Sequence, residues 1–173
     1  MELYFDKGTL TQDDIRAGLK IGVSRREVMP IFCTSGKWDI GTKRLMEFII
    51  NVAPGPLKAP AFLSTEGEEI TADEAAPAVA FVFKSQIEQH IGEITYFRVI
   101  RGKITEGTEL VNTRTGNKEK LSQLFAVAGK NRIKVTELSA GDIGCTVKLK
   151  GTRTNDTLSA AAAPITIEPI VFP

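Results

Sequence analysis

Histidine and long apolar runs are scarce in this chain of 173 residues, and each shortage excludes a class of protein. His90 is the single histidine, and no spacing of histidine and cysteine matches a zinc site. No run approaches the roughly 18 apolar residues that span a bilayer. Residues 1–6 are acidic and lack the basic-then-apolar order of a secretion signal. We therefore expect a cytoplasmic protein without a membrane partner.

Cysteine is also rare, and the two cysteines are far apart. Cys33 and Cys145 each lie in an apolar run, so we expect both to be buried and reduced rather than joined in a disulfide. A nucleophilic role for Cys33 would need a general base, and His90 lies in a different part of the chain. The sequence therefore gives no catalytic residue.

The charge is balanced overall but uneven along the chain. The net charge is +1, yet residues 98–134 contain nine basic residues against three acidic ones, a net +6 that leaves −5 for the rest. A basic segment in a nearly neutral chain predicts local contact with a polyanion. The alternative is a solvated face of a small sheet.

Residues 1–53 have the pattern of helix, buried strand, loop and helix. Thr11 is expected as the N-cap of the first helix, with acidic residues in its first turn. The apolar run 28–33 predicts a strand covered on both faces, and residues 42–52 have apolar residues at helical spacing. One strand and two helices cannot cover each other, so we interpret residues 1–53 as the end of an α/β domain.

Prolines and acidic residues fill residues 54–74, which we expect to form an exposed linker. From residue 75 to 164, β-branched and aromatic runs alternate with glycine-containing turns. Short strands without intervening helices predict an all-β sandwich or barrel of roughly 90 residues. The expected strands cover residues 78–87, 93–101, 109–113, 119–125, 131–135, 143–149 and 165–170.

Residues 34–37, TSGK, join the predicted strand to the second helix. They are not a phosphate loop, because Trp38 follows Lys37 where a serine or threonine must hold magnesium. In an open α/β sheet, however, a loop at the carboxyl end of a strand is where ligands bind. The Ser35 hydroxyl and the amides of Ser35 and Gly36 could hold a carbonyl group or a purine edge.

Several segments closely resemble elongation factor G, a translational GTPase. Residues 90–102 (HIGEITYFRVIRG), 139–144 (SAGDIG) and 154–158 (TNDTL) resemble its second domain, and residues 28–37 (VMPIFCTSGK) resemble the last guanine-contacting motif of its GTPase domain. The resemblance implies a mostly β chain with a translation-factor-type antiparallel β-barrel, domain II, at residues 75–164. Before it, residues 1–53 would be the last helix–strand–helix of the GTPase domain. After it, residues 165–173 would begin the connection to domain III.

The resemblance also implies a partial nucleotide site. Ser35, Gly36 and Lys37 would contact the guanine base, with the Gly36 amide directed at its exocyclic oxygen. Gly36 replaces the usual alanine, and Thr34 replaces a common glycine. The full-length parent would bind GTP or GDP with magnesium. The phosphate-loop and switch motifs do not occur in these 173 residues, so we expect this fragment to bind no cofactor and to be inactive as a GTPase.

The implied function is ribosomal translocation, in which the barrel docks on small-subunit rRNA and relays the state of the GTPase domain. The remaining GTPase domain and domain III would be its partners within the same polypeptide. Alternatives are a fragment of a ribosome-protection (tetracycline resistance) or release-factor-type GTPase, or a free-standing β-barrel that binds proteins. The candidate RNA contacts are Arg98, Arg101, Lys118, Lys120, Lys130 and Arg132.

Overall fold

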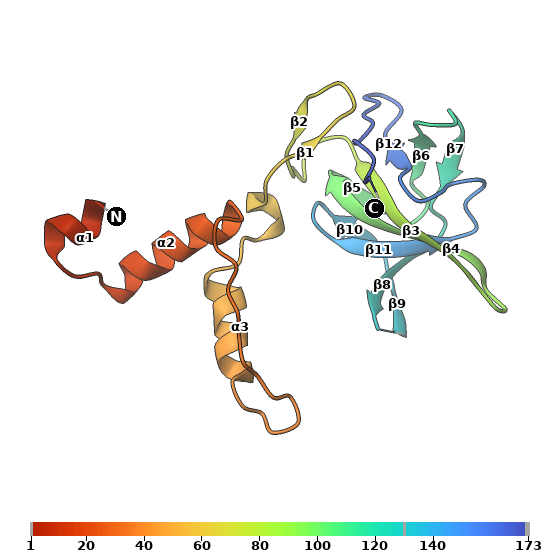
Figure 1. Cartoon of the computed structure of the whole chain (residues 1–173). Coiled ribbons are helices and arrows are strands. Elements are labelled where there is room, and N and C mark those ends of the chain that lie inside the picture. Colours follow the sequence, from red (N-terminus) through yellow and green to blue (C-terminus); the bar gives the residue numbers. More distant parts are fainter. Residues whose placement is uncertain (1, 130, 172–173) are drawn as a thin grey trace. The chain divides into compact units, whose positions relative to one another are not determined.

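The computed structural model describes residues 2–129 and 131–171, in a helical unit that ends at Pro60 and a β-rich unit that begins at Ala61 (Figure 1). The helical unit contains α1 (Glu2–Lys7), α2 (Gln12–Ser24), α3 (Thr42–Asn51) and a short 3-10 helix, Pro56–Lys58. None of the described helices is long and apolar enough to cross a bilayer.

Thr11 caps α2, as predicted. Its side-chain oxygen accepts the Asp14 N–H at 3.2 Å, and the Asp14 carboxylate accepts the Thr11 N–H at 3.0 Å, which is the reciprocal capping box. The side-chain hydrogen bond with Thr11 lowers the pKa of Asp14 from its ordinary value. The second predicted helix is also confirmed, because α3 begins at Thr42.

The strand predicted over residues 28–33 is not formed. The segment belongs to no strand, and Met29 and Ile31 are 83% and 91% exposed. A strand needs a neighbour that pairs with its backbone groups, and the described residues of the helical unit supply none for this segment. The prediction of a buried strand was therefore wrong for this chain.

The β-rich unit is built on an eight-stranded antiparallel sheet in the order β7-β6-β12-β3-β4-β11-β8-β9. Its two longest strands, β3 (Val79–Glu88) and β4 (Gly92–Arg101), form a hairpin, and the turn contains His90 with a φ of 72°. A separate two-stranded ladder pairs β5 with β10. The remaining bounds are β5 (Lys103–Thr105), β6 (Glu109–Asn112), β7 (Lys118–Lys120), β8 (Leu124–Ala128), β9 (Asn131–Val135), β10 (Glu137–Ser139), β11 (Ile143–Val147) and β12 (Thr157–Ser159).

One apolar core is shared by strands from most of the sheet. Leu110 of β6 and Leu124 of β8, which are far apart in the strand order, belong to the same buried cluster as Phe97 of β4. Leu138 of the separate β10 ladder joins them. Strands so distant in order can share one core only if the sheet curves around it. The predicted antiparallel, barrel-type fold is confirmed.

A second, smaller core lies on the outer face of the sheet. It contains Val79 and Phe81 of β3, which alternate with residues of the inner core, together with Ile70 and Ile167. Ile70 belongs to a short hairpin of β1 (Phe62–Leu63) and β2 (Glu69–Ile70). The segment 61–70, expected as part of an exposed linker, therefore packs on the barrel through Ile70, which is buried, and Phe62, which is partly buried, although most of its other residues are exposed.

Several strand bounds differ from those predicted. Residues 119–125 contain a break between β7 and β8, and residues 165–170 make only an isolated bridge between Ile167 and Ser64. The strands β5, β10 and β12 were not predicted. Each has three residues, which is too short to show an alternating pattern in the sequence.

Candidate functional site

The loop between residues 33 and 41 is a tight turn closed by its own backbone. The Ser35 N–H donates to the Ile40 carbonyl oxygen at 2.9 Å, and the Ile40 N–H donates to the Ser35 carbonyl oxygen at 3.1 Å. Gly41 has a φ of +76°, and a Cβ there would lie 2.9 Å from the Cys33 carbonyl oxygen. Glycine is therefore required where the loop joins α3.

This geometry decides which of the predicted base-contacting groups are available. The Ser35 N–H is used within the loop, whereas the exposed Gly36 N–H makes no hydrogen bond to the part of the chain that the structure describes. A Cβ at Gly36 would meet no atom within 4 Å, so the alanine expected from the resemblance would fit. The Lys37 Nζ lies 5.2 Å from the centre of the Trp38 ring. The loop thus offers the Ser35 hydroxyl and the Gly36 N–H to a ligand.

The two cysteines differ in burial. Both are free, but Cys33 is exposed and Cys145 is buried, so the expected burial of Cys33 was wrong. Burial raises the pKa of the Cys145 thiol, which makes it a packing group rather than a nucleophile. Among the described residues, no three side chains of His, Cys, Asp or Glu are grouped so that they could hold a metal ion.

The predicted RNA-contact residues come from three separate strands. Arg98 and Arg101 lie on β4, in the middle of the sheet order. Lys118 and Lys120 lie on β7 at one end of the order, and Arg132 lies on β9 at the other. The sheet order therefore does not place these residues on one edge. Lys130, the sixth candidate, lies outside the described residues.

Most basic side chains of the segment 98–134 already have a carboxylate partner. The pairs join Lys118 to Glu109 at 3.0 Å, Lys134 to Glu106 at 2.8 Å, Lys103 to Glu74 and Glu137, Arg114 to Asp156, and Arg132 to Glu88. Within residues 98–129 and 131–134, only Arg98, Arg101 and Lys120 make no ion pair with the described chain. The charge that is free to meet a polyanion is thus smaller and more localised than the sequence suggested.

A β-bulge places Arg98 and Arg101 on the same face of β4. Two side chains three residues apart on a regular strand point to opposite faces. Here the register shifts between Val79 and Ala80, so that Arg98 lies opposite Phe81 and Arg101 lies opposite Val79. Phe81 and Val79 both belong to the outer core, and cross-strand partners share a face. Both arginines therefore lie on the outer face.

Arg98 is partly buried and rests on an aromatic ring. Its guanidinium carbon lies 5.3 Å from the centre of the Phe62 ring, a cation–π contact. On its other flank, Arg98 lies opposite Ile143 of β11. The Nε atoms of Arg98 and Arg101 are buried and have no hydrogen-bond partner among the described residues.

A groove of about 690 Å³ occupies the neighbouring part of this outer face. Tyr96 lines it two residues before Arg98 on β4, and the Lys84 Nζ lies 5.5 Å from the centre of the Tyr96 ring. Arg132 and Ile143 also line the groove, so it connects Arg132 with the face that carries Arg98. Sequence reasoning missed Lys84 and Tyr96, although the alternation of Tyr96 with Arg98 was a signal that they share a face.

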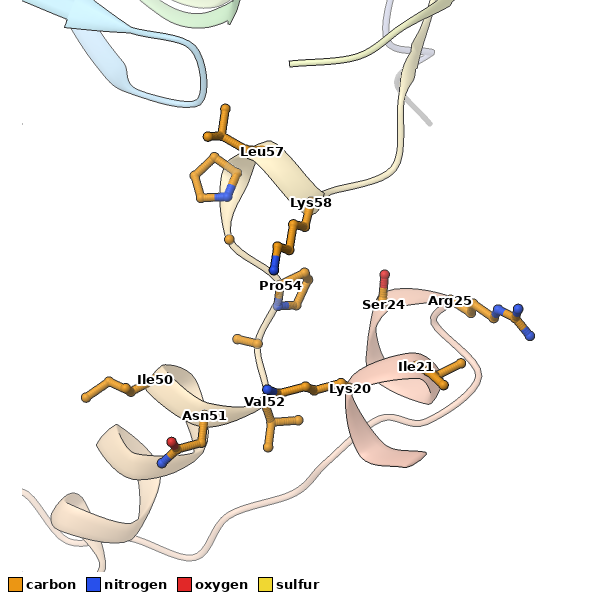
Figure 2. A pocket seen from close by; sticks show the side chains of 13 residues that line it. Lys20, Ile21, Ser24, Arg25, Ile50, Asn51, Val52, Pro54, Leu57 and Lys58 are labelled. Carbon is orange, nitrogen blue, oxygen red and sulfur yellow. The ribbon is translucent and has the colours of Figure 1, made fainter. Parts of the chain in front are cut away.

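The helical unit contains a separate apolar pocket of about 700 Å³. Figure 2 shows that its lining comes from the ends of α2 and α3 and from the proline-containing segment that follows α3, including Ile21, Ile50 and Leu57. The lining contains three basic residues and no acidic one, and none of the predicted site residues belongs to it. The pocket therefore shares no residue with the predicted guanine-contacting loop at residues 33–41.

Comparison with known proteins identifies the barrel. The family model of elongation factor G domain 2 matches residues 77–161. A crystal structure of a protein from Thermus thermophilus superposes with a TM-score of 0.69 and 26% sequence identity. The match covers 93% of this chain and 22% of that chain, so this chain spans about a fifth of the protein it matches. Residues 77–161 are therefore an elongation factor G domain 2, a domain of the translation factors.

Proposed function

We propose that this chain acts within a cytoplasmic translocation GTPase, where its barrel docks on the rRNA of the small ribosomal subunit and relays the state of the GTPase domain. The observation that carries the proposal is the outer face of β4, where Arg98 and Arg101 share a face and make no ion pair within the described residues. The match to a translation-factor domain supports it.

Contacts between basic side chains and the RNA backbone suit a protein that binds RNA independently of its base sequence. Arginine and lysine side chains bind phosphate oxygens, which fix the position of a protein on RNA but contain no base information. Strands hold the side chains rigidly, so a movement of the barrel is passed directly to the RNA. Lys118 and Arg132 would first have to exchange Glu109 and Glu88 for phosphates, which reduces their net contribution.

The loop at residues 33–41 belongs to the same proposal. In the full-length parent, the Ser35 hydroxyl and the Gly36 N–H would contact the guanine base of GTP or GDP. The residues of this loop fit a base edge only, because they do not form a phosphate loop. The exposed apolar residues Met29, Ile31 and Ile50 support packing against the remaining GTPase domain, whereas residues 165–173 would lead to domain III.

Co-sedimentation with purified ribosomal subunits tests the proposed docking. The chain is mixed with small or large subunits at a series of KCl concentrations, and the bound fraction is measured. We expect binding to the small subunit that weakens as salt increases, since phosphate contacts release counterions. A salt-independent affinity, or no binding to the small subunit, would remove the RNA-docking role.

A further inference from the structure

We propose that the apolar pocket of the helical unit binds an anionic amphiphile, a small molecule with an apolar chain and one negatively charged head group. All of its lining residues lie between Lys20 and Lys58, so the pocket belongs entirely to the helical unit. The inference goes beyond the proposed ribosomal docking and does not depend on it, because it uses no residue of the barrel.

The first argument is the size and the apolar lining of the pocket. Its volume of about 700 Å³ lies within the roughly 300–1,000 Å³ of typical small-molecule sites. Val52 is buried in its wall, whereas the side chains of Ile21 and Leu57 are 54% and 56% exposed. An apolar chain seated in the pocket would remove this exposed apolar surface from water.

The second argument is the sign of the charge around the pocket. Its three basic residues are Lys20, Arg25 and Lys58, and none of them makes an ion pair with the part of the chain that the structure describes. In Figure 2 the side chains of Lys20 and Lys58 extend toward the chain between Val52 and Pro54. Three unpaired cations beside an apolar wall favour a ligand that has both an apolar part and a negative charge.

The two helix ends at the pocket do not account for these cations. The C-terminal end of a helix has roughly half a negative charge, so the ends of α2 and α3 together offset about one of the three positive charges. Carbonyl oxygens near these ends also have partners already. Those of Ile21 and Gly22 in α2, and that of Phe48 in α3, accept backbone N–H groups. The lining therefore keeps a positive charge for a ligand.

The third argument is that the wall after α3 is restrained before any ligand binds. Pro54 and Pro56 each have a fixed φ, and the Lys58 N–H donates to the Gly55 carbonyl oxygen at 2.9 Å. The Val52 N–H donates to the Phe48 carbonyl oxygen at 2.8 Å, which fixes the end of α3. A wall that is already ordered loses little conformational freedom on binding.

The test is a nuclear magnetic resonance titration of the whole, isotope-labelled 173-residue chain. Decanoate and decanol serve as probes, since they share an apolar chain and differ in the charge of the head group. Each is kept below the concentration at which it aggregates. Decanoate should shift the amide signals of Val52, Ala53 and Leu57 in a saturable way and leave the barrel signals unchanged. It should bind about tenfold more tightly than decanol, because its carboxylate meets the cations.

Variants separate the charge of the pocket from its apolar wall. The double variant Lys20→Gln/Lys58→Gln should weaken decanoate binding about tenfold and leave decanol binding unchanged. Lys20→Arg/Lys58→Arg keeps both charges and should retain the affinity for decanoate. Leu57→Asn should weaken both probes alike, by about tenfold, because it removes apolar contact.

The matched control is Lys43→Gln, which removes a charge from α3 outside the pocket lining and should leave both affinities unchanged. Far-ultraviolet circular dichroism checks that the helices of each variant remain formed. Unchanged barrel signals in the same spectra show that the rest of the chain is unaffected.

Three outcomes would overturn the proposal. Equal affinities for decanoate and decanol would show that the cations do not select a negative head group. Decanoate shifts that are absent, or spread over the barrel, would show that the pocket is not a specific site. A polyglutamate peptide that shifts the pocket signals as strongly as decanoate would make an acidic polypeptide segment the occupant. None of these results bears on the binding of small ribosomal subunits, so the two proposals can fail separately.

Discussion

The Arg114 guanidinium and the Asp156 carboxylate form a bidentate ion pair, with Nε to Oδ1 at 2.6 Å and Nη2 to Oδ2 at 2.8 Å. Asp156 is 3% exposed and also accepts hydrogen bonds from the Asn112 side chain and the Arg153 N–H, each at 2.8 Å. The pair joins the turn after β6 to the segment before β12. Arg114 is therefore a structural residue, although it lies in the basic segment.

Replacing Asp156 with asparagine should destabilise the barrel. The amide keeps the shape of the carboxylate but loses its charge and one acceptor, so the buried donors around it lose charge-assisted hydrogen bonds. We expect the free energy of unfolding to fall by about 2–3 kcal/mol. Urea unfolding followed by far-ultraviolet circular dichroism measures it. Glu109→Gln, which breaks an exposed pair, should cost less than about 1 kcal/mol, and an equal loss in the two variants would refute this role for Asp156.

Stability should also depend on Asp156 at acid pH. Burial raises the pKa of this carboxyl, but hydrogen bonds from Arg114, Asn112 and the Arg153 N–H outweigh burial and hold the pKa below its ordinary value of 3.8. As the pH falls, the Asp156 carboxylate is therefore protonated at a higher pH in the unfolded chain than in the folded chain. The stabilisation is fully present well above pH 3.8 and is lost as the pH falls through the folded pKa.

Unfolding free energies measured from pH 7 downward check this dependence. The unaltered chain should lose more stability below about pH 4 than Asp156→Asn does, because the variant lacks the titrating group. Parallel curves for the two proteins would show that the acid sensitivity comes from other carboxyl groups.

Gly102 should tolerate alanine less well than Gly107 does. Both have positive φ, +74° and +86°, so alanine is strained at either by about 1–2 kcal/mol. A Cβ at Gly102 would also lie 2.6 Å from the Ala76 carbonyl oxygen, whereas a Cβ at Gly107 would meet nothing within 4 Å. Thermal unfolding should therefore show a larger fall in Tm for Gly102→Ala. Equal falls in Tm for the two variants would mean that the backbone near Ala76 moves aside with little loss of stability.

Guanine nucleotides should bind this chain weakly when it is alone. Trp38 is the single tryptophan, is 70% exposed and lies in the 33–41 loop, so its fluorescence reports on that loop. We expect no saturable change with micromolar GDP or GTP and no GTP turnover, because phosphate and magnesium contacts supply most of the binding and the catalysis. Saturable quenching together with phosphate release would contradict this expectation.

The features that could be predicted from the sequence are those set by local patterns. The Thr11 cap depends on residues within one helical turn, and the turn at His90 lies between two long β-rich runs. The barrel follows from many short strands separated by turns, and the elongation factor G resemblance agrees with the family match at residues 77–161.

The rest depends on contacts between distant residues. The strand predicted over residues 28–33 needed a partner strand that the described residues do not supply, and apolar composition alone cannot show this. The bulge that aligns Arg98 with Arg101 is a property of strand register. Ion pairs also join residues far apart in sequence, such as Arg132 and Glu88. The sequence therefore could not show which basic side chains of the segment 98–134 are paired with a carboxylate and which are not.

Hydroxyl-radical footprinting of small-subunit rRNA tests the central proposal most directly. Subunits are probed at low salt with and without the chain, and with the Arg98→Gln/Arg101→Gln double variant. The account predicts that the chain protects a discrete stretch of rRNA backbone and that the double variant loses this protection at the same concentration. Unchanged rRNA cleavage at concentrations where the chain co-sediments with the subunit would contradict it, because the barrel would then bind ribosomal protein rather than RNA.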